Sequence, residues 1–193
     1  LEIDDGKPNH CELLAPLIEE LLRKNSSTIN DLTQIRINIG PGNLSSLRVG
    51  ISAANIFASF AKVPVYGISS FLLYAFNYEY SNKNLITLFD LKNDNFAYAK
   101  FIKENSKISL IESDFNINLN RIELIDMNNS IIVGTGLKKY KKKYQNNSTP
   151  TSFLDEDFKI TSESLANVDL DFQENLIFNK MPLVPFNSYS FGS

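Results

Sequence analysis

The sequence is poor in the residues that build metal and hydrolase sites. It contains a single cysteine, Cys11, a single histidine, His10, and no tryptophan. One cysteine excludes a disulfide framework. One cysteine and one histidine together are too few for a metal site built from several cysteines and histidines. A lone histidine also argues against Ser-His-Asp or Cys-His hydrolase chemistry. The N-terminus lacks a signal-peptide pattern, and we expect no segment that spans a membrane, so the default expectation is a cytoplasmic protein.

The composition is sufficient for a folded core. Apolar residues make up 43% of the 193 residues, with 14 Phe and 8 Tyr, which excludes wholesale disorder and allows one medium domain or two small ones. The formal net charge is −3. A protein that grips nucleic acid by itself usually has a strongly basic balance, so the sequence does not indicate autonomous nucleic-acid binding.

Two helices near the N-terminus carry more apolar surface than one sheet needs. The first begins at Asn9, with Glu12 in capping-box spacing, and its apolar side chains cover nearly half of the cylinder. The second, residues 45–61, has one narrow polar stripe between apolar faces. These helices are therefore predicted to be buried on more than one side. The apolar positions of the first are Leu13, Leu14, Leu17, Ile18, Leu21 and Leu22; in the second, the stripe is Arg48, Ser52, Asn55 and Ser59, the bulky face Val49, Ile56 and Phe60, and the flat face Gly50, Ala54, Ala58 and Ala61.

The pattern around these helices predicts an α/β protein. Residues 34–39 alternate strictly and predict a strand, which Gly40-Pro41-Gly42 ends. A strand–helix–strand–helix order follows to about residue 80, and it implies a crossover layer. Later runs predict further strands, a turn at Gly134–Gly136, a polar lysine-rich segment, a mostly helical stretch and an extended tail. The later strands are residues 85–90, 95–101, 107–111 and 130–133, the lysine-rich segment is 138–143, the helical stretch is 162–179 and the tail is 182–193.

Each candidate site has a structural alternative. Gly40-Pro41-Gly42 lies between a strand and a helix N-terminus, where phosphates often bind, but it lacks the residues of a P-loop, and a tight turn is the favoured interpretation. Arg48 is expected to form an ion pair within the fold or to contact a partner chain, rather than to hold an anion. The lysine run at 138–143 could touch RNA phosphates, although short basic runs are more often simply solvated.

The segment Ile39–Ile51 closely resembles the GPGSFTGLRIG-like loop and helix of the TsaB family. Residues 9–14 resemble that family's H-x-E-x-LLP region, and residues 63–70 resemble its IPVVGVSSL segment. The resemblance covers residues 9–72 in order, whereas the C-terminal half matches weakly. It implies an actin/Hsp70-like (ASKHA, ribonuclease H-like) two-lobed α/β fold, with lobes at 1–80 and 81–193 and a first lobe that looks truncated at its N-terminus.

The resemblance also implies a function. Members of the TsaB family are non-catalytic scaffolds that bind the transferase TsaD and, with the ATPase TsaE, support threonylcarbamoylation of the tRNA adenosine next to the anticodon. No catalytic residue, cofactor or metal is expected, tRNA contact is expected only indirectly, and a homodimer is an alternative to the TsaD heterodimer. The expected interface residues are Leu14, Ile18, Leu22, Leu47, Arg48, Gly50, Ile51, Ala54 and Ala58, and the expected structural loop is Gly40, Pro41 and Gly42.

Two other functions compete with the scaffold. One is an ATP-dependent phosphotransferase or TsaD-like catalyst of the same superfamily, which would require acidic residues and glycine loops around a nucleotide. The other is a homodimeric scaffold unrelated to tRNA. For the scaffold interpretation we expect Gly50→Leu or Ala54→Glu to abolish the TsaD complex and to leave the monomer soluble.

Overall fold

The computed structural model describes most of the chain between His10 and Phe186. The described residues are 10–80, 82–91, 93–105, 107–144, 153–155, 158, 160–172 and 176–186. Residues 1–9, the acidic residues 156 and 157, the end of the tail, and the side chains of His10 and Cys11 lie outside the described part.

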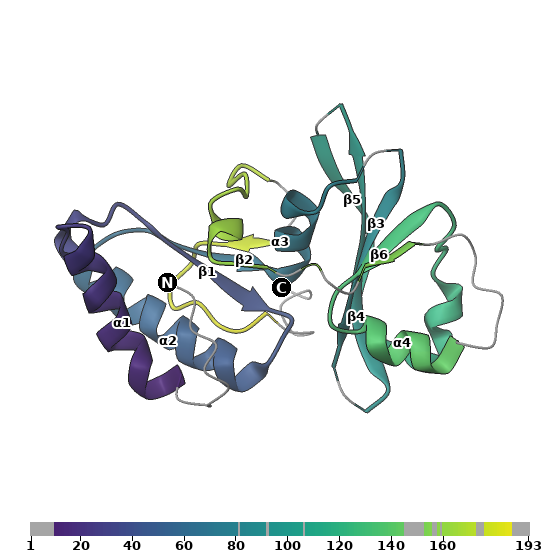
Figure 1. The fold of residues 1–193 in the computed structure, drawn as a ribbon, viewed down its shortest axis with the longest axis horizontal. Helices are drawn as coiled ribbons and strands as arrows, with labels where there is room; N and C mark the ends of the chain where they lie inside the picture. Colours follow the sequence, from purple (N-terminus) through teal and green to yellow (C-terminus); the bar gives the residue numbers. More distant parts are fainter. Residues whose placement is uncertain are drawn as a thin grey trace.

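The first sheet contains the predicted strand–helix–strand unit (Figure 1). β1 (Ile35–Gly40) runs parallel to β2 (Val65–Ser69), and α2 (Leu44–Ala61) connects them. Asn43 caps α2 by accepting a hydrogen bond from the backbone N–H of Ser46, which satisfies one of the unpaired donors of the first turn. α1 (His10–Lys24) packs on α2, and the 3-10 turn η1 (Ile29–Asp31) leads into β1.

The second sheet has five strands in the order β5-β4-β3-β6-β7. β3 pairs antiparallel with β4, β4 pairs antiparallel with β5, and β6 and β7 run parallel to β3. β5 is longer than the sequence pattern predicts. The bounds are β3 Asn84–Asp90, β4 Asn95–Glu104, β5 Lys107–Asn118, β6 Ser130–Val133 and β7 Phe153–Asp155.

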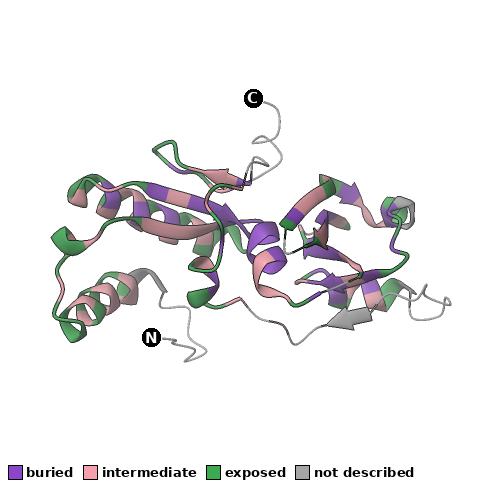
Figure 2. Cartoon of the chain, turned by 90° about the horizontal axis from the view of Figure 1, so that it is seen from above, coloured by how far each residue is buried: buried purple, intermediate pink, exposed green. Residues whose placement is uncertain are grey.

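Both faces of the second sheet are covered, and alternate side chains supply two hydrophobic clusters. Leu85 and Phe89 of β3 face α3 (Ser70–Asn77) and the first sheet, whereas Ile86 and Leu88 face the opposite side. On that opposite side the sheet is covered by the 3-10 turn η2 (Leu119–Leu124) and by α4 (Leu137–Tyr144). Figure 2 shows the buried residues concentrated in the strands and in the centre of the molecule.

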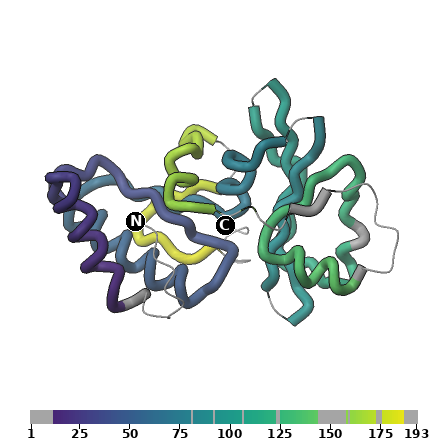
Figure 3. The backbone as a smooth tube through the Cα atoms, in the orientation of Figure 1, coloured from purple at the N-terminus to yellow at the C-terminus, as the bar shows by residue number. Residues whose placement is uncertain are grey.

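The C-terminal segment returns to the first sheet (Figure 3). β8 (Ile177–Phe178) pairs antiparallel with β2, and Asn55 of α2 holds the backbone of Leu183 by two hydrogen bonds of 2.9 Å. Further along, the backbone N–H of Phe186 donates to the carbonyl of Ile39 at 2.8 Å. The lobe boundary at residues 80 and 81 stays a prediction, but the segment after Leu176 belongs spatially to the first sheet.

Two expectations about the second half are wrong. The lysine-rich run forms the helix α4, because Leu137 and Tyr140, three residues apart, are both buried against the sheet. The stretch 162–179, expected to be mostly helical, contains only the 3-10 turn η3 (Glu163–Leu165) and β8 among its described residues. Arg36 of β1 donates to the carbonyls of Leu165, Ala166 and Val168, which fixes this stretch as irregular chain against the sheet.

Candidate partner interface

The flat face of α2 packs on the protein's own first sheet. Ile51, Ala54 and Ala58 are at most 5% exposed and belong to the main core cluster. A Cβ atom placed on Gly50 would lie 3.2 Å from Cδ1 of Ile37 in β1, so the missing side chain is what lets the strand approach. Small residues on this face therefore serve close packing of α2 on β1 and β2.

The bulky face of the same helix points into solvent. Ile56 and Phe60 are 67% and 68% exposed, and their spacing of four residues places them one above the other on the helix. In α1, Leu21 is 45% exposed. Arg48, Ser52 and Ser59 of the polar stripe are exposed beside this face. An apolar stripe of this kind on a helix surface is typical of a surface that binds a partner, rather than of one that stays in solvent.

The structure thus separates the residues of the expected interface into two groups. Exposed or half-buried positions on the two helices remain available to a partner, whereas Gly50, Ile51, Ala54 and Ala58 face or form the internal core. Gly50→Leu and Ala54→Glu are therefore expected to damage the monomer itself. The available positions are Leu14, Ile18, Leu22, Leu47 and Arg48, with Leu47 also packed against the core. Ile56 and Phe60 were absent from the expected interface although the helical wheel already placed them together.

The glycine loop is packed by the chain's own residues. Gly40 has φ +103°, which favours glycine, and a Cβ atom there would lie 2.7 Å from Cδ1 of Leu47. Asn38 accepts hydrogen bonds from the backbone N–H of Gly40 and from the hydroxyl of Ser70. Pro41 is buried and Gly42 is exposed. The backbone N–H groups of Gly40 and Ser46, on either side of this loop, therefore already have partners within the chain.

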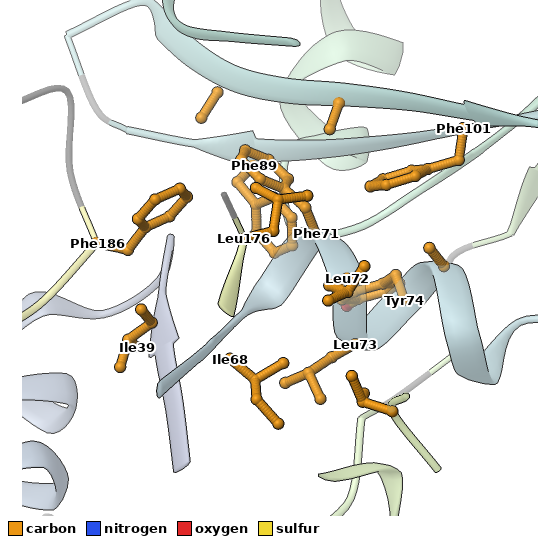
Figure 4. Packing of buried hydrophobic residues seen from close by; sticks show 14 of the residues in the cluster. Ile39, Ile68, Phe71, Leu72, Leu73, Tyr74, Phe89, Phe101, Leu176 and Phe186 are labelled. Atoms are coloured by element: carbon orange, nitrogen blue, oxygen red, sulfur yellow. The ribbon is translucent and has the colours of Figure 1, made fainter. Parts of the chain in front are cut away.

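Aromatic side chains fill the space between the two sheets (Figure 4). Phe71 of α3 lies with its ring centroid 5.4 Å from that of Phe89 in β3 and 5.4 Å from that of Phe115 in β5. Phe186 of the C-terminal segment lies 4.7 Å from Phe115. Ligands often bind between lobes, but here edge-to-face aromatic contacts occupy the junction.

The main charged cluster lies on the far face of the second sheet. Lys100 of β4 is 5% exposed, and its Nζ donates to the carbonyl of Asp126 at 2.6 Å and lies 3.7 Å from that residue's carboxylate. A hydrogen bond from the backbone of Asn128, and then the charge of Lys100, lower the pKa of Asp126. Burial, and then the charges of Glu112 and Asp114, raise the pKa of Tyr98 to about 12. The cluster balances a buried cation against carboxylates.

The described residues of this cluster form no metal site. Among the described residues, no three His, Cys, Asp or Glu side chains come together as metal ligands. An open surface hollow of about 470 Å³ lies at the hairpin end of β4, and amide and lysine side chains line it, including Asn82, Lys103 and Asn129. The lining contains no nucleophile paired with a base.

The expectation that no segment is long and apolar enough to span a membrane is wrong, because the length and composition of α2 would allow it. The 18 residues of α2, with mean hydropathy 1.2, are long and apolar enough to do so. However, its inner face packs on β1 and β2, and Asn55 holds the C-terminal segment, so insertion would break both contacts.

Comparisons with known proteins identify the family. A family model described as TsaD, tRNA N6-adenosine threonylcarbamoyltransferase, matches residues 5–183. The chain belongs to this family. Within it the chain is TsaB/YeaZ-like: a tRNA threonylcarbamoyladenosine biosynthesis protein TsaB from Buchnera aphidicola of Schizaphis graminum is 25% identical over 146 residues, which cover 72% of the chain and 70% of that protein. The TsaB of the Buchnera of Acyrthosiphon pisum is also 25% identical, over 53% of the chain and 47% of its own length.

A solved structure supports the same fold. YeaZ from Pseudomonas aeruginosa aligns with a TM-score of 0.66 at 20% identity, over 82% of this chain and 76% of that one. The actin/Hsp70-like architecture inferred from the sequence is thereby confirmed. The family also places the chain in the pathway of tRNA threonylcarbamoyladenosine biosynthesis.

Proposed function

We propose that this chain is a non-catalytic subunit that binds a TsaD-type transferase through α1 and α2 and supports threonylcarbamoylation of the tRNA adenosine next to the anticodon. The observation that carries the proposal is the stripe of Ile56 and Phe60, which are 67% and 68% exposed on a helix whose other face is already packed. Leu21 of α1 adds a further exposed apolar side chain on the helix that packs on α2.

The energetics of this stripe favour a helical partner. Burying a large aliphatic or aromatic side chain stabilises a complex by about 1.5–3 kcal/mol. Two such side chains one turn apart can supply the central anchors of an interface. Arg48, Ser52 and Ser59 border the stripe and would form its polar rim. We expect the same two helices to serve if the chain forms a homodimer instead.

A supporting role fits the junction between the lobes. A nucleotide or other substrate bound there would have to displace Phe71, Phe115 and Phe186, whose rings lie within 6.3 Å of one another. Displacing buried aromatic side chains costs several kcal/mol. We therefore expect no cofactor. From the family resemblance we also expect a cytoplasmic location shared with tRNA, and TsaE as a further member of the assembly.

The test is reconstitution with TsaD from the same organism. TsaD and TsaE, supplied with threonylcarbamoyl-adenylate as the group donor, are assayed for tRNA modification with and without this chain, and complex formation is followed by co-purification. The proposal expects a stable complex and modification that depends on the chain. Absence of a complex, or ATP hydrolysis by the isolated chain at a rate typical of enzymes, would instead favour a phosphotransferase of the same fold.

A further inference from the structure

The helix α4 presents lysines on one side and core residues on the other. Leu137 and Tyr140 are 1% and 5% exposed, and the hydroxyl of Tyr140 lies 3.3 Å from the sulfur of Met127. Lys138 and Lys142 are exposed. They are four residues apart, so they stand on one face of the helix, roughly 6 Å apart along its axis.

The acidic residues near the start of α4 are partly neutralised by a lysine of the helix. Nζ of Lys139 lies 3.1 Å from a carboxylate oxygen of Asp90 and 3.4 Å from one of Asp94. Burial alone would lower the pKa of Lys139, but the hydrogen bonds and charges of these two carboxylates raise it overall. Lys139 therefore remains protonated and offsets one of the two negative charges that would otherwise repel an anionic partner.

A third exposed cation, Arg121, lies in η2 beside the end of the helix. Lys143 donates to the side-chain oxygen of Asn120 at 2.6 Å, which joins α4 to η2, and the next residue in η2, Arg121, is exposed. Within the described part of the chain, Lys138, Lys142 and Arg121 have no ion pair. These three residues, called the α4 surface below, form a basic site on a protein whose net charge is −3.

The chemistry of the α4 surface favours a solvated polyanion. An amphipathic helix that binds membranes inserts apolar side chains, but the apolar residues Leu137 and Tyr140 of α4 face the core. Exposed lysine and arginine side chains suit the phosphates of a nucleic-acid backbone. We propose that the α4 surface binds the RNA phosphate backbone and contributes to holding tRNA in the complex with the transferase. The choice of tRNA rests on the proposed function.

The test compares two variants with the same change of charge. Lys138→Glu with Lys142→Glu reverses two of the three charges of the α4 surface. Lys107→Glu with Lys180→Glu alters two exposed lysines elsewhere. Lys107 begins β5, and η2 follows the other end of this strand. A strand of that length places Lys107 roughly 35 Å from the start of η2. A second version with glutamine at positions 138 and 142 guards against effects of charge reversal on folding.

Affinity for transcribed tRNA is measured at several salt concentrations, for the complex with TsaD and for the chain alone. The α4 variants are expected to weaken binding by at least tenfold near 0.1 M salt. They should also reduce the slope of log K against log salt by about 1.4 to 1.8, as loss of two phosphate contacts requires. The control variant is expected to retain affinity and slope.

Several results would overturn this proposal. Equal losses in both pairs of variants would assign the effect to net charge, and unchanged tRNA binding in the α4 variants would remove the site. Loss of binding to phosphatidylserine-containing vesicles with unchanged tRNA binding would reassign the surface to membranes. If no complex with TsaD forms, the proposed function fails by itself, whereas the salt slope of the chain alone still decides whether the α4 surface contacts RNA.

Discussion

The two sheets differ in how completely the helices on them bury their apolar side chains within the chain. The five-stranded sheet is covered on both faces, and α4, the basic helix on its far face, buries its apolar residues Leu137 and Tyr140 completely within the chain. The three-stranded sheet has α2 on it, but α2 buries only its small face and leaves Ile56 and Phe60 exposed. Helix apolarity alone therefore does not predict burial within the monomer; the excess apolar surface on the first lobe is available for assembly.

The largest expected effect contrasts two phenylalanines. Phe71 is fully buried at the junction of the sheets, whereas Phe60 is 68% exposed. Phe71→Ala should lower the free energy of unfolding by about 3–5 kcal/mol, because it removes apolar burial and leaves a cavity. Phe60→Ala should change it by no more than about 0.5 kcal/mol. Urea denaturation of the isolated chain measures both, and a comparable loss from Phe60→Ala would mean that the α2 stripe is already packed in the monomer.

The packing of the C-terminal segment against the first sheet depends on a side-chain amide. Asn55→Ala removes both hydrogen bonds to the backbone of Leu183, which is 4% exposed, and leaves that backbone N–H and carbonyl unpaired. The expected loss of stability is about 1–3 kcal/mol. Hydrogen exchange at the amide of Leu183 should accelerate at the same time. Ser59→Ala, on the same polar stripe but exposed, is the control and should leave the exchange rate unchanged.

A smaller effect should appear at alkaline pH in the second sheet. Burial, and then nearby carboxylates, raise the pKa of Tyr98 to about 12, whereas an unfolded tyrosine titrates near 10. Between these values the unfolded chain releases the proton more readily, so stability contributed by neutral Tyr98 is present below pH 10 and is lost as pH rises toward 12. Tyr98→Phe should therefore show a shallower fall in stability over this range. An identical fall in both proteins would mean that Tyr98 ionises as freely when folded.

The sequence predicted the elements whose local pattern and tertiary environment agree. Strict alternation at residues 34–39, the Gly40-Pro41-Gly42 break and the strand–helix–strand–helix order led to β1, α2 and α3 close to their observed bounds. The sequence pattern did not predict the segments whose conformation is set by long-range contacts. The chain after Ser162 is held by Arg36 and by pairing of β8 with β2, and neither contact leaves a local signal.

The two apolar faces of α2 were predicted, but not which of them packs on the sheet, and the interface itself stays a prediction. A helical wheel shows that α2 has a flat and a bulky apolar face, yet it does not show which face meets the sheet. The geometry of β1 decides it, because Ile37 approaches so close to Gly50 that a bulky face could not pack there. In α4 the charge of five lysines concealed the spacing of Leu137 and Tyr140, so a helix was read as a polar segment.

The central claim is that the exposed stripe of α2 binds the transferase, and the dissociation constant with TsaD tests it most directly. Ile56→Glu with Phe60→Glu should raise that constant by roughly 100-fold or more, since two central apolar anchors are lost. Ile111→Glu, which alters an apolar residue of β5 that is 49% exposed, should leave it within about twofold. Unchanged affinity in the α2 variant, with a folded monomer, would contradict the account.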